Sequence, residues 1–592
     1  MNYLTRLNAL SFGRTAILSW KCEVGNLPGC VKTEERKFLP IYTFTLLHLF
    51  TDRPKMPGGL AFCLLALLSV LAASCGGGTG APPDTGETSA GQAGYAEKHR
   101  PQFHFSPKEK WTNDPNGMVY FDGEYHLFYQ HYPDSTVWGP MHWGHAVSTD
   151  LVHWEHLPIA LYPDSLGYIF SGSAVVDWKN TTGFGDGGQP PLVAIFTYHD
   201  AAAAKAGSES HQSQALAYSN DRGRTWTKYE GNPVLPNPGG VRDIRDPKVI
   251  WDDDSGQWVM VLAVGDHAGF WGSPDLKNWK KLSEFGKTLG AHGGVWECPD
   301  LFPMVVEGTG EKMWALIINL NPGNPNGGSG TQYFIGRFDG KTFTPDPAFL
   351  PYVQGGKGVW LDYGKDNYAG VTWSDAPAGR RLFIGWMSNW QYANQVPTGA
   401  WRNAMTIPWS LALKKTDEGY RIFPQPVKEL EALRTATHRL EKTEVNGRLG
   451  LAGQLGFPSR LSEMELEFAL PEDAAGSFGV ELSNGRGETY RIGFDAAANQ
   501  FFSDRTKAGD APFSGDFAKQ PSVAPRFSRD KTLRLHLFFD VASAELFADG
   551  GATVMTEIFF PGEDFNQVSL FAEGGKVELA GGKVHQLKSI WQ

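Results

Sequence analysis

Cysteine and charge are both scarce in this sequence. Its 592 residues contain five cysteines, and four of them, Cys22, Cys30, Cys63 and Cys75, precede any region that we expect to fold. Only Cys298 remains, so a disulfide framework is excluded. Charged residues make up 20%, and 64 acidic against 53 basic residues give a formal net charge of −11. Such a chain lacks the basic field that concentrates nucleic acid or anionic lipid, so no nucleic-acid partner is expected.

Long hydrophobic runs are missing too. The apolar run Leu60–Ser74 is shorter than the roughly 20 residues of a membrane-spanning helix. It ends in small residues before Cys75, a junction that resembles a bacterial lipobox, in which the signal is cut before a cysteine that carries lipid. We expect residues 56–75 to be a lipoprotein-type signal and residues 1–55 a leader from an incorrectly assigned start. The alternative is a buried helix of a small N-terminal domain.

The segment that follows has few large apolar residues. Gly, Pro, Ser and Thr dominate residues 76–94, so the chain there cannot bury enough surface to fold. We expect residues 76–98 to be a flexible tether between Cys75 and a folded enzyme. The protein would then be exported and held at the bacterial cell envelope, facing the periplasm or the outside, and its only membrane contact would be the lipid anchor.

Glycine, proline and tryptophan are abundant, with 70, 38 and 20 residues. Between residues 99 and 423, short β-branched and aromatic runs alternate with turns, which predicts an all-β domain. We expect hairpins over residues 118–129 and 249–262, and a third at Arg381–Trp386. A weak repeat at residues 148–154, 219–226 and 273–279 predicts turns whose Asp binds local backbone while its Trp packs below. Its spacing favours a five-bladed β-propeller over the alternative, a β-sandwich.

A second all-β unit is predicted after a short joint. Val427, Leu430 and Leu433 recur at helical spacing, so we expect one helix within residues 424–440. Alternating apolar residues then resume, as in residues 463–470 and 533–540, which predicts strands buried on one face. Residues 441–592 are therefore expected to form a β-sandwich.

Three acidic motifs stand at predicted strand starts. They are Trp111-Thr112-Asn113-Asp114-Pro115-Asn116-Gly117, Arg245-Asp246-Pro247 and Trp296-Glu297-Cys298. An aspartate before proline is expected in extended backbone, which directs its carboxylate. Each motif alone is also typical of a structural turn, a surface ion pair or a strand end. Together, at one end of a propeller axis, the three carboxyl groups would converge.

These three motifs, in this order, resemble those of glycoside hydrolase family 32, the β-fructofuranosidases, and the resemblance covers residues 102–592. It implies a five-bladed propeller followed by a β-sandwich, with Asp114 as nucleophile, Glu297 as acid/base and Asp246 as the residue that grips sugar hydroxyls. Thr112 departs from the family's methionine, which affects the expected shape of the pocket wall more than the chemistry.

The resemblance also implies sugar-contacting residues and a substrate. The predicted contacts are Trp111, Asn113, Gln130, Trp138, Phe170, Ser171, Arg245 and Trp296, with no metal and no cofactor. The motifs look most like those of exo-acting levanases and inulinases, which implies release of single fructose units from fructan (levan or inulin) and cleavage of sucrose. The sequence makes no prediction of oligomeric state.

Other readings remain open from the sequence. An arabinan- or xylan-type glycosidase shares the propeller plan, and a catalytically silent fructan-binding lipoprotein would need only the binding residues. A sialidase is disfavoured because no arginine cluster around a carboxylate is evident. Transfer of fructose to another sugar would use the same three carboxyl groups as hydrolysis.

Overall fold

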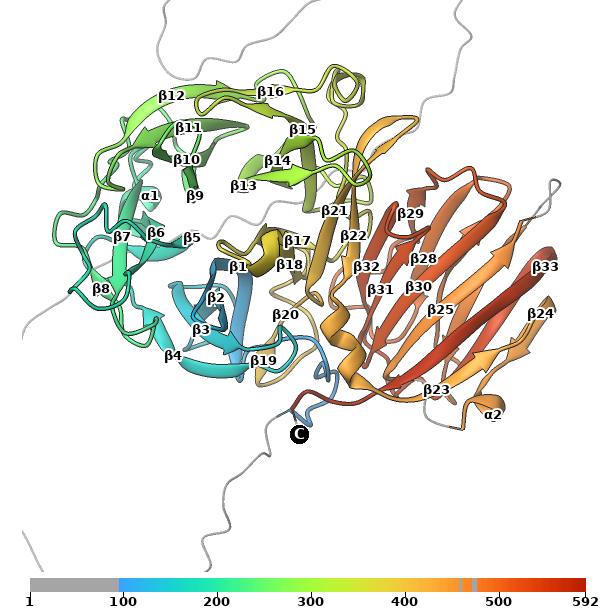
Figure 1. Ribbon diagram of the computed structural model, residues 1–592. Helices are drawn as coiled ribbons and strands as arrows, with labels where there is room; N and C mark the ends of the chain where they lie inside the picture. The colour runs from blue at the N-terminus through green and yellow to red at the C-terminus, as the bar shows by residue number, and fades with distance from the viewer. Residues whose placement is uncertain (1–94, 457–459, 471–475, 592) are drawn as a thin grey trace, which may run out of the picture. The chain divides into compact units, whose positions relative to one another are not determined.

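In the computed structural model, which describes residues 95–456, 460–470 and 476–591, five sheets form a β-propeller (Figure 1). The first two blades contain β1 (Lys110–Phe121), β2 (Glu124–Tyr132), β3 (His142–Ser148) and β4 (Glu155–Leu161), then β5 (Tyr168–Val176), β6 (Leu192–His199), β7 (Gln212–Ser219) and β8 (Thr227–Lys228). The short helix α1 (Ala201–Lys205) lies between β6 and β7.

The other three blades repeat this plan. They contain β9 (Ile244–Asp252), β10 (Gln257–Val264), β11 (His267–Ser273) and β12 (Lys280–Phe285); β13 (Val295–Val305), β14 (Lys312–Asn321), β15 (Gly330–Phe338) and β16 (Phe343–Pro345); and β17 (Tyr368–Thr372), β18 (Leu382–Met387), β21 (Trp409–Thr416) and β22 (Gly419–Pro426). Two short strands complete the pairing: β20 (Ala404–Met405) pairs with β18, and β19 (Trp401–Arg402) pairs with β1 in parallel and so links the first and last blades.

Burial along each blade follows from its place in the ring. The innermost strands β1, β5, β9, β13 and β17 surround the axis, and nearly every residue of β1 and β17 is buried (Figure 1). The outer strands β4 and β12 are exposed or partly exposed, and only the last residue of each is buried. Because the inner strands are buried on both faces, even polar residues such as Asn113, Asp246 and Asp300 lie buried in them.

The predicted turns are confirmed, with one exception among the hairpins. β1 pairs with β2 and β9 with β10 in antiparallel register, but residues 382–386 of the third predicted hairpin lie in a single strand, β18. The three repeat segments join the third and fourth strands of the first three blades. In them the Oδ1 atoms of Asp150, Asp221 and Asp275 accept local backbone N–H groups.

The C-terminal domain is a β-sandwich whose layers share β33 (Gln567–Leu587). The first half of β33 pairs with β26 (Ser477–Ser483), which continues to β27 (Thr489–Asp495), β28 (Gln500–Lys507) and β29 (Ser522–Pro525). Its second half pairs with β25 (Ser462–Ala469), which continues to β30 (Thr532–Asp540), β31 (Ser543–Ala548) and β32 (Thr553–Ile558). β24 (Thr443–Gly450) also pairs with β33, and α2 (Ala452–Leu455) follows it.

The joint between the domains is shorter than predicted. A 3₁₀ helix, η3 (Lys428–Leu433), buries Leu430 and Leu433, and β23 (Arg434–Leu440) already pairs with β33 of the sandwich. Two other 3₁₀ turns, η1 (Leu350–Tyr352) and η2 (Pro377–Gly379), lie in propeller loops. The sandwich therefore begins at Arg434, because hydrogen bonding to β33 satisfies backbone groups that a longer helix would have paired internally.

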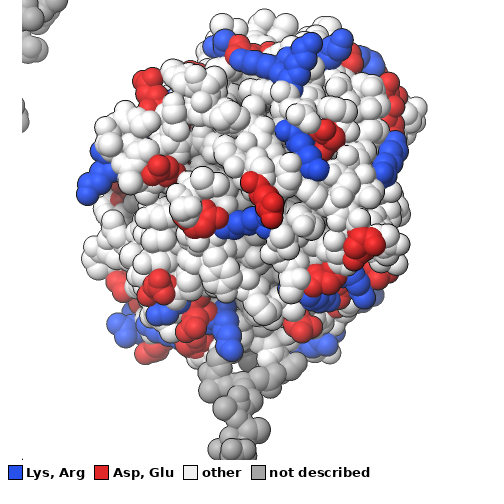
Figure 2. Space-filling view, turned by 90° about the vertical axis from the view of Figure 1, so that its left-hand side faces the viewer, with Lys and Arg blue, Asp and Glu red and all other residues white. Residues whose placement is uncertain are grey.

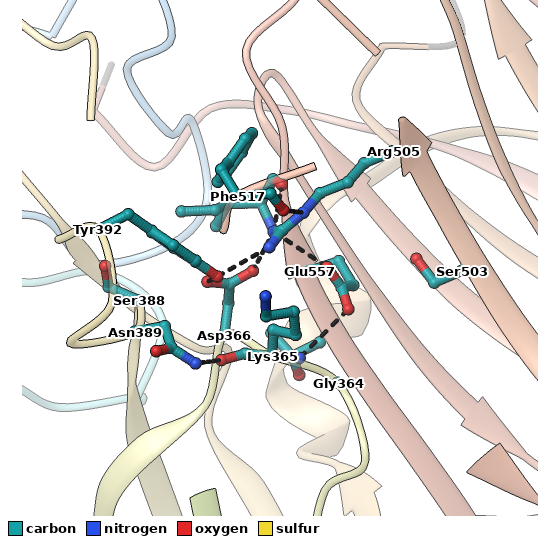
Figure 3. Close-up of polar contacts among 12 residues, drawn as sticks. Gly364, Lys365, Asp366, Ser388, Asn389, Tyr392, Ser503, Arg505, Phe517 and Glu557 are labelled. Carbon is teal, nitrogen blue, oxygen red and sulfur yellow. Dashed lines mark hydrogen bonds and ion pairs between the residues drawn. The ribbon is translucent and has the colours of Figure 1, made fainter. Parts of the chain in front are cut away.

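Propeller and sandwich share a buried ionic cluster (Figure 3). Arg505 of β28 lies 2.5 Å from Asp366 and 3.0 Å from Glu557, and it donates to the Tyr392 hydroxyl at 2.8 Å. Glu557 also accepts from the backbone N–H of Lys365. The cluster joins a propeller loop to the sandwich through charge-assisted hydrogen bonds.

The N-terminal side of the fold also differs from the prediction. Tyr95, which we placed in the tether, stacks on Trp591 with 3.8 Å between ring centroids, so the folded part includes residues 95–98. The predicted leader, the signal and Cys75 lie outside the described residues. Within the described ranges, no helix is long and apolar enough to span a membrane.

Candidate active site

The three predicted carboxyl groups occupy equivalent positions on three inner strands. Asp114 lies near the start of β1, Asp246 near the start of β9, and Glu297 near the start of β13. In each strand the antiparallel register shifts at this point, between Thr112 and Pro115, between Arg245 and Lys248, and between Glu297 and Asp300. Because proline has no N–H to donate, the X-Pro pair in each strand interrupts the ladder and re-aims the side chain beside it.

The backbone at two of these interruptions is left-handed. Asp246 has φ +62° and Cys298 has φ +40°, so the predicted extended conformation is wrong for Asp246. The bulge is the reason, since it places Asp246 outside the regular ladder despite the following proline. Left-handed backbone at a non-glycine residue costs about 1 to 3 kcal/mol, and such residues cluster at functional sites.

Asp114 is held in one orientation by its neighbours. Its Oδ1 accepts a hydrogen bond from Asn113 Nδ2 at 2.9 Å, and its Oδ2 accepts one from Ser171 Oγ at 2.8 Å. Burial raises the pKa of Asp114, the negative charge of Glu297 raises it further, and the two hydrogen bonds act in the opposite direction. Asp114 and Glu297 also line the same cavity.

Cys298 links Asp114 to Asp246. Its thiol lies 3.5 Å from Asp114 Oδ2 and 3.7 Å from Asp246 Oδ2, and its backbone N–H donates to Asp246 Oδ2 at 2.9 Å. Asp246 is 6% exposed, and burial raises its pKa to about 7 although Arg245 opposes the shift.

Glu297 is bound by two donors. Arg245 Nη2 donates to its Oε1 at 2.9 Å, and the Tyr368 hydroxyl donates to its Oε2. Arg245 also pairs with Asp243 at 2.6 Å, which fixes the guanidinium. Burial opposes the charge on Arg245, but Glu297, Asp246 and Asp243 together raise its pKa above the ordinary value.

These groups face one cavity of about 530 Å³. All but two of the predicted side chains line it: Asp114, Asp246, Glu297, Asn113, Gln130, Trp138, Phe170, Ser171 and Arg245. Trp138 is 39% exposed and meets Phe170 edge-on at 6.2 Å, which forms an apolar wall. The amide nitrogen of Gln130 is buried without a partner among the described residues, so it is free to donate to a ligand.

The two exceptions, Trp111 and Trp296, correct the prediction of direct sugar contact. Both are fully buried and neither lines the cavity. Trp111 donates to Asn113 Oδ1 at 2.7 Å and stacks on Trp390, which does line the cavity. Trp296 donates to the Ala291 carbonyl, on the side opposite to Glu297 because successive side chains of a strand alternate. Both tryptophans support the pocket wall from behind.

Several residues of the site were not predicted. Tyr368, on the first position of β17, reaches Glu297 from the fifth blade, and no motif around it signals this contact. His199, His211, Lys205, Arg242, Asp243, Asn321 and Trp390 also line the cavity. Arg242 and Asp243 lie two or three residues before the Arg245-Asp246-Pro247 motif, so their position next to that motif could have identified them. Thr112 is buried behind the wall and donates to the Gln130 carbonyl.

One grouping of metal-ligand type occurs in the described residues, and it is far from this cavity. Glu463, Glu465 and His536 of the sandwich lie within 4.8 Å of one another. Arg434 donates to both oxygens of Glu463 at 2.7 Å, so that carboxylate already has its counter-ion. Burial opposes the shift, yet His536 and Arg434 lower the pKa of Glu463 to about 2.

A propeller with three carboxyl groups converging on a pocket with an apolar wall and a free hydrogen-bond donor has the features of a glycoside hydrolase. Family models for the glycosyl hydrolases family 32 N-terminal domain and C terminal match residues 104–426 and 429–586. The chain therefore belongs to glycoside hydrolase family 32, and the protein is a glycoside hydrolase.

Similar proteins cover almost the whole described chain. A levanase of Bacillus subtilis is 46% identical over 84% of this chain and 72% of its own length. An extracellular exo-inulinase of Aspergillus niger is 39% identical over 84% of this chain and 96% of its own. Among solved structures, the exo-inulinase of Aspergillus awamori is 36% identical with a TM-score of 0.77, covering 84% of this chain and all of that one.

Proposed function

We propose that this enzyme hydrolyses terminal β-D-fructofuranosyl residues of fructans and of sucrose, with retention of configuration at the anomeric carbon. The observation that carries the proposal is the pairing of Asp114 with Glu297 across one pocket, from β1 and β13. Relatives named levanase and exo-inulinase support fructan as the substrate class. A structurally similar β-fructofuranosidase of Schwanniomyces occidentalis, solved with fructosyl-erythritol, supports a fructosyl group in the pocket.

In the proposed first step, the Asp114 carboxylate attacks the anomeric C2 of the terminal fructose. Glu297 gives its proton to the glycosidic oxygen, the bond to the rest of the chain breaks, and a fructosyl ester forms on Asp114. Asn113 and Ser171 hold the attacking carboxylate in place by hydrogen bonds to its two oxygens. The ionised Asp114 also stabilises the positive charge that develops on the sugar in the transition state.

In the second step, Glu297 takes a proton from water, and the water oxygen attacks C2 and releases Asp114. Arg245 and Tyr368 bind the two oxygens of Glu297, so the residue keeps one position while its proton leaves and returns. The Cys298 thiol contacts the carboxyl groups of both Asp114 and Asp246. Asp246 is proposed to accept hydrogen bonds from the fructose hydroxyl groups. The free amide of Gln130 would donate to another sugar oxygen.

The test is a time course of products from levan, inulin and sucrose. We expect fructose as the first product from all three, and early accumulation of long oligosaccharides would contradict exo action. In methanol as co-solvent, methyl β-fructofuranoside should form, whereas the α-anomer would rule out retention. Cleavage of arabinofuranosides without cleavage of sucrose would favour the arabinan-type alternative.

Glu297→Gln should lower the rate on sucrose about 10³-fold or more, since the leaving oxygen is no longer protonated. The same variant should retain much more of the wild-type rate of fluoride release from β-fructofuranosyl fluoride, because fluoride leaves without a proton. Glu307→Gln, which changes an exposed glutamate just beyond β13, is the matched control and should behave as wild type. Equal losses on both substrates would contradict the acid role.

We further propose that the enzyme is exported and held at the cell envelope by lipid on Cys75, followed by a tether. The relative from Aspergillus niger is an extracellular exo-inulinase, which supports export. Mass spectrometry of the mature protein should find a lipid-modified N-terminal Cys75, and Cys75→Ser should release the activity from the membrane fraction. An unprocessed chain that begins at Met1 would contradict both proposals.

A further inference from the structure

A second cavity, of about 430 Å³, lies at the opposite end of the same inner strands. β5, β9 and β13 contribute residues near their starts to the catalytic pocket and residues near their ends to this second one, which we call the far pocket. On β9, Asp246 lines the first and Asp252 the second, and six residues of extended strand span about 20 Å.

Buried polar residues lie between the two pockets. Lys248 Nζ lies 3.2 Å from Asp300 Oδ1 and donates to the Thr372 carbonyl at 2.7 Å. The Thr372 hydroxyl in turn donates to Asp300 Oδ2 at 2.7 Å. Lys248 and Thr372 also line the far pocket, and with Asp300 they are 5% exposed or less, so they close its inner end. A ligand in the far pocket is consequently held away from the catalytic carboxyl groups.

The far pocket is rich in tryptophan: Trp178, Trp251, Trp258, Trp314 and Trp373 line it. Trp178 is 62% exposed, and within the described residues only Trp138 and Trp178 are tryptophans with widely exposed side chains. Trp138 lines the catalytic pocket, and Trp178 lines the far pocket. An indole left in water at the mouth of a cavity is typical of a binding surface rather than of a folding core.

The exposed indole is held in place before any ligand arrives. Trp178 Nε1 donates to Asp375 Oδ1 at 3.0 Å, and the ring packs on Phe121 with centroids 5.9 Å apart. Trp251 Nε1 donates to Asp253 Oδ1 at 2.8 Å. Ser374 Oγ, also in the lining, is buried without a partner among the described residues. Fixed indoles beside free polar atoms suit a sugar ring, with its apolar face and its hydroxyl rim.

The charges in the lining of the far pocket favour a neutral ligand. Four acidic and four basic side chains line the far pocket, so their charges balance. The rim pairs them locally, as in the 3.3 Å contact between Lys312 and Asp254. On the side of the molecule shown in Figure 2, acidic and basic side chains are likewise intermixed, with uncharged areas between them. A neutral polyhydroxyl chain fits this balance better than an anionic polymer does.

We propose that the far pocket is a non-catalytic binding site for a segment of fructan chain, an inference that rests on the proposed function. Binding there would keep a polymer beside the enzyme and raise the effective concentration of chain ends at the catalytic pocket. Sucrose is too short to occupy both pockets at once, so its hydrolysis would not depend on the far pocket.

The test measures retention of the full chain in native gels that contain levan or inulin, on a Glu297→Gln background so that the polymer survives. Trp178→Ala should weaken retention by at least one of the two fructans about tenfold, the loss expected from one stacking contact. Trp178→Phe, which keeps a ring, should restore part of it. With Glu297 intact, Trp178→Ala should leave kcat/KM on sucrose unchanged and lower the rate on dilute fructan.

Tyr162→Ala is the matched control, because Tyr162 is 54% exposed and lines neither pocket. Equal retention of Trp178→Ala and Tyr162→Ala would overturn the inference, as would equal retention of the parent chain by soluble starch. Loss of sucrose activity in Trp178→Ala would also overturn it. If the wild type released no fructose from fructan or sucrose, the proposed function itself would fail, which is a separate result.

Discussion

At the scale of single residues, three prolines interrupt the inner strands beside the three predicted carboxyl groups. Pro115, Pro247 and Pro299 each stand where an inner strand loses its register. Each removes one backbone donor and leaves an adjacent side chain aimed at the axis rather than along the regular pleat. The arrangement has an energetic cost at Asp246, which has left-handed backbone and a carboxyl group with 6% exposure.

Because the carboxyl group of Asp246 is buried, Asp246→Asn should change how the stability of the protein depends on pH. The pKa of Asp246 is raised to about 7 by burial, against roughly 3.9 in an unfolded chain. Between these two pKa values, the folded protein binds more protons at Asp246 than the unfolded chain does. The free energy of unfolding therefore falls by about 4 kcal/mol as the pH rises from 4 through 7. The amide cannot ionise, so the variant should lose less stability than the wild type between pH 5 and 8.

Urea unfolding at pH 5 and pH 8 measures this difference, and titrating groups that do not interact with Asp246 cancel between the two proteins. The same variant should be strongly impaired on sucrose, since asparagine has one neutral acceptor oxygen in place of the two charged oxygens that we propose Asp246 offers to a sugar. Parallel stability profiles for wild type and variant would show that Asp246 is already ionised in the folded state at pH 5.

At the scale of elements, the hairpin of β30 and β31 fastens the sandwich to the start of the propeller. His104 lies between Asp540 at 2.8 Å and Glu545 at 2.9 Å, and all three side chains are buried. Glu545 also accepts from Trp409 of β21 at 2.9 Å. Burial opposes protonation, but the two carboxylates raise the pKa of His104 to about 9.

His104→Gln should therefore remove a pH-dependent share of stability. The contribution of His104 is fully present below its unfolded pKa of about 6.5 and is lost as pH rises through 9, which amounts to about 3 kcal/mol. Thermal unfolding at pH 6 and pH 10 should show a smaller drop for the variant than for the wild type. Identical drops would mean that His104 is neutral in the folded protein.

The ionic cluster around Arg505 makes a second prediction. Arg505→Met leaves Asp366 and Glu557 as neighbouring buried carboxyl groups without their cation, which should cost about 3 to 5 kcal/mol. The midpoint of urea unfolding measures the loss. Arg337→Met, which breaks an exposed pair with Glu311, is the matched control and should leave the midpoint almost unchanged. Equal behaviour of the two variants would contradict the role of the cluster.

At the scale of the whole molecule, residues near the two ends of the described chain pack on each other. Besides its stacking on Tyr95, Trp591 donates to the Pro101 carbonyl at 2.9 Å, and the N–H of Ile590 donates to the Gln102 carbonyl at 2.8 Å. These contacts complete the joint between the first segment of the propeller domain and the last segment of the sandwich.

Trp591→Ala should lower the free energy of unfolding by about 2 kcal/mol, from lost apolar burial and stacking. Trp178→Ala removes the same side chain from a widely exposed position, so it should be nearly neutral for stability. The comparison by urea unfolding separates folding contacts from binding contacts. A larger loss for Trp178→Ala would show that its indole belongs to the core.

Much of this architecture could be predicted because it depends on local sequence patterns. Turn residues, β-branched runs and the spaced Asp and Trp repeats predicted blades, and three acidic motifs predicted the carboxyl groups. Tyr368 could not be found in this way, since its contact with Glu297 joins positions 71 residues apart and has no local signature. Trp111 and Trp296 were misjudged because a motif shows proximity along the chain but not which side of a strand a ring occupies.

The sequence alone determined the all-β class and the two-domain order, because strand propensity and turn chemistry act over a few residues. Its three acidic motifs located the three carboxyl groups, although their X-Pro pairs misled us about the backbone of Asp246. Only the tertiary structure decided which aromatic rings reach solvent, which cation neutralises each buried carboxylate, and that the inner strands end in a second tryptophan-lined pocket. Those features depend on how five separate strands pack around one axis, and burial, which sets both pKa and exposure, exists only after that packing.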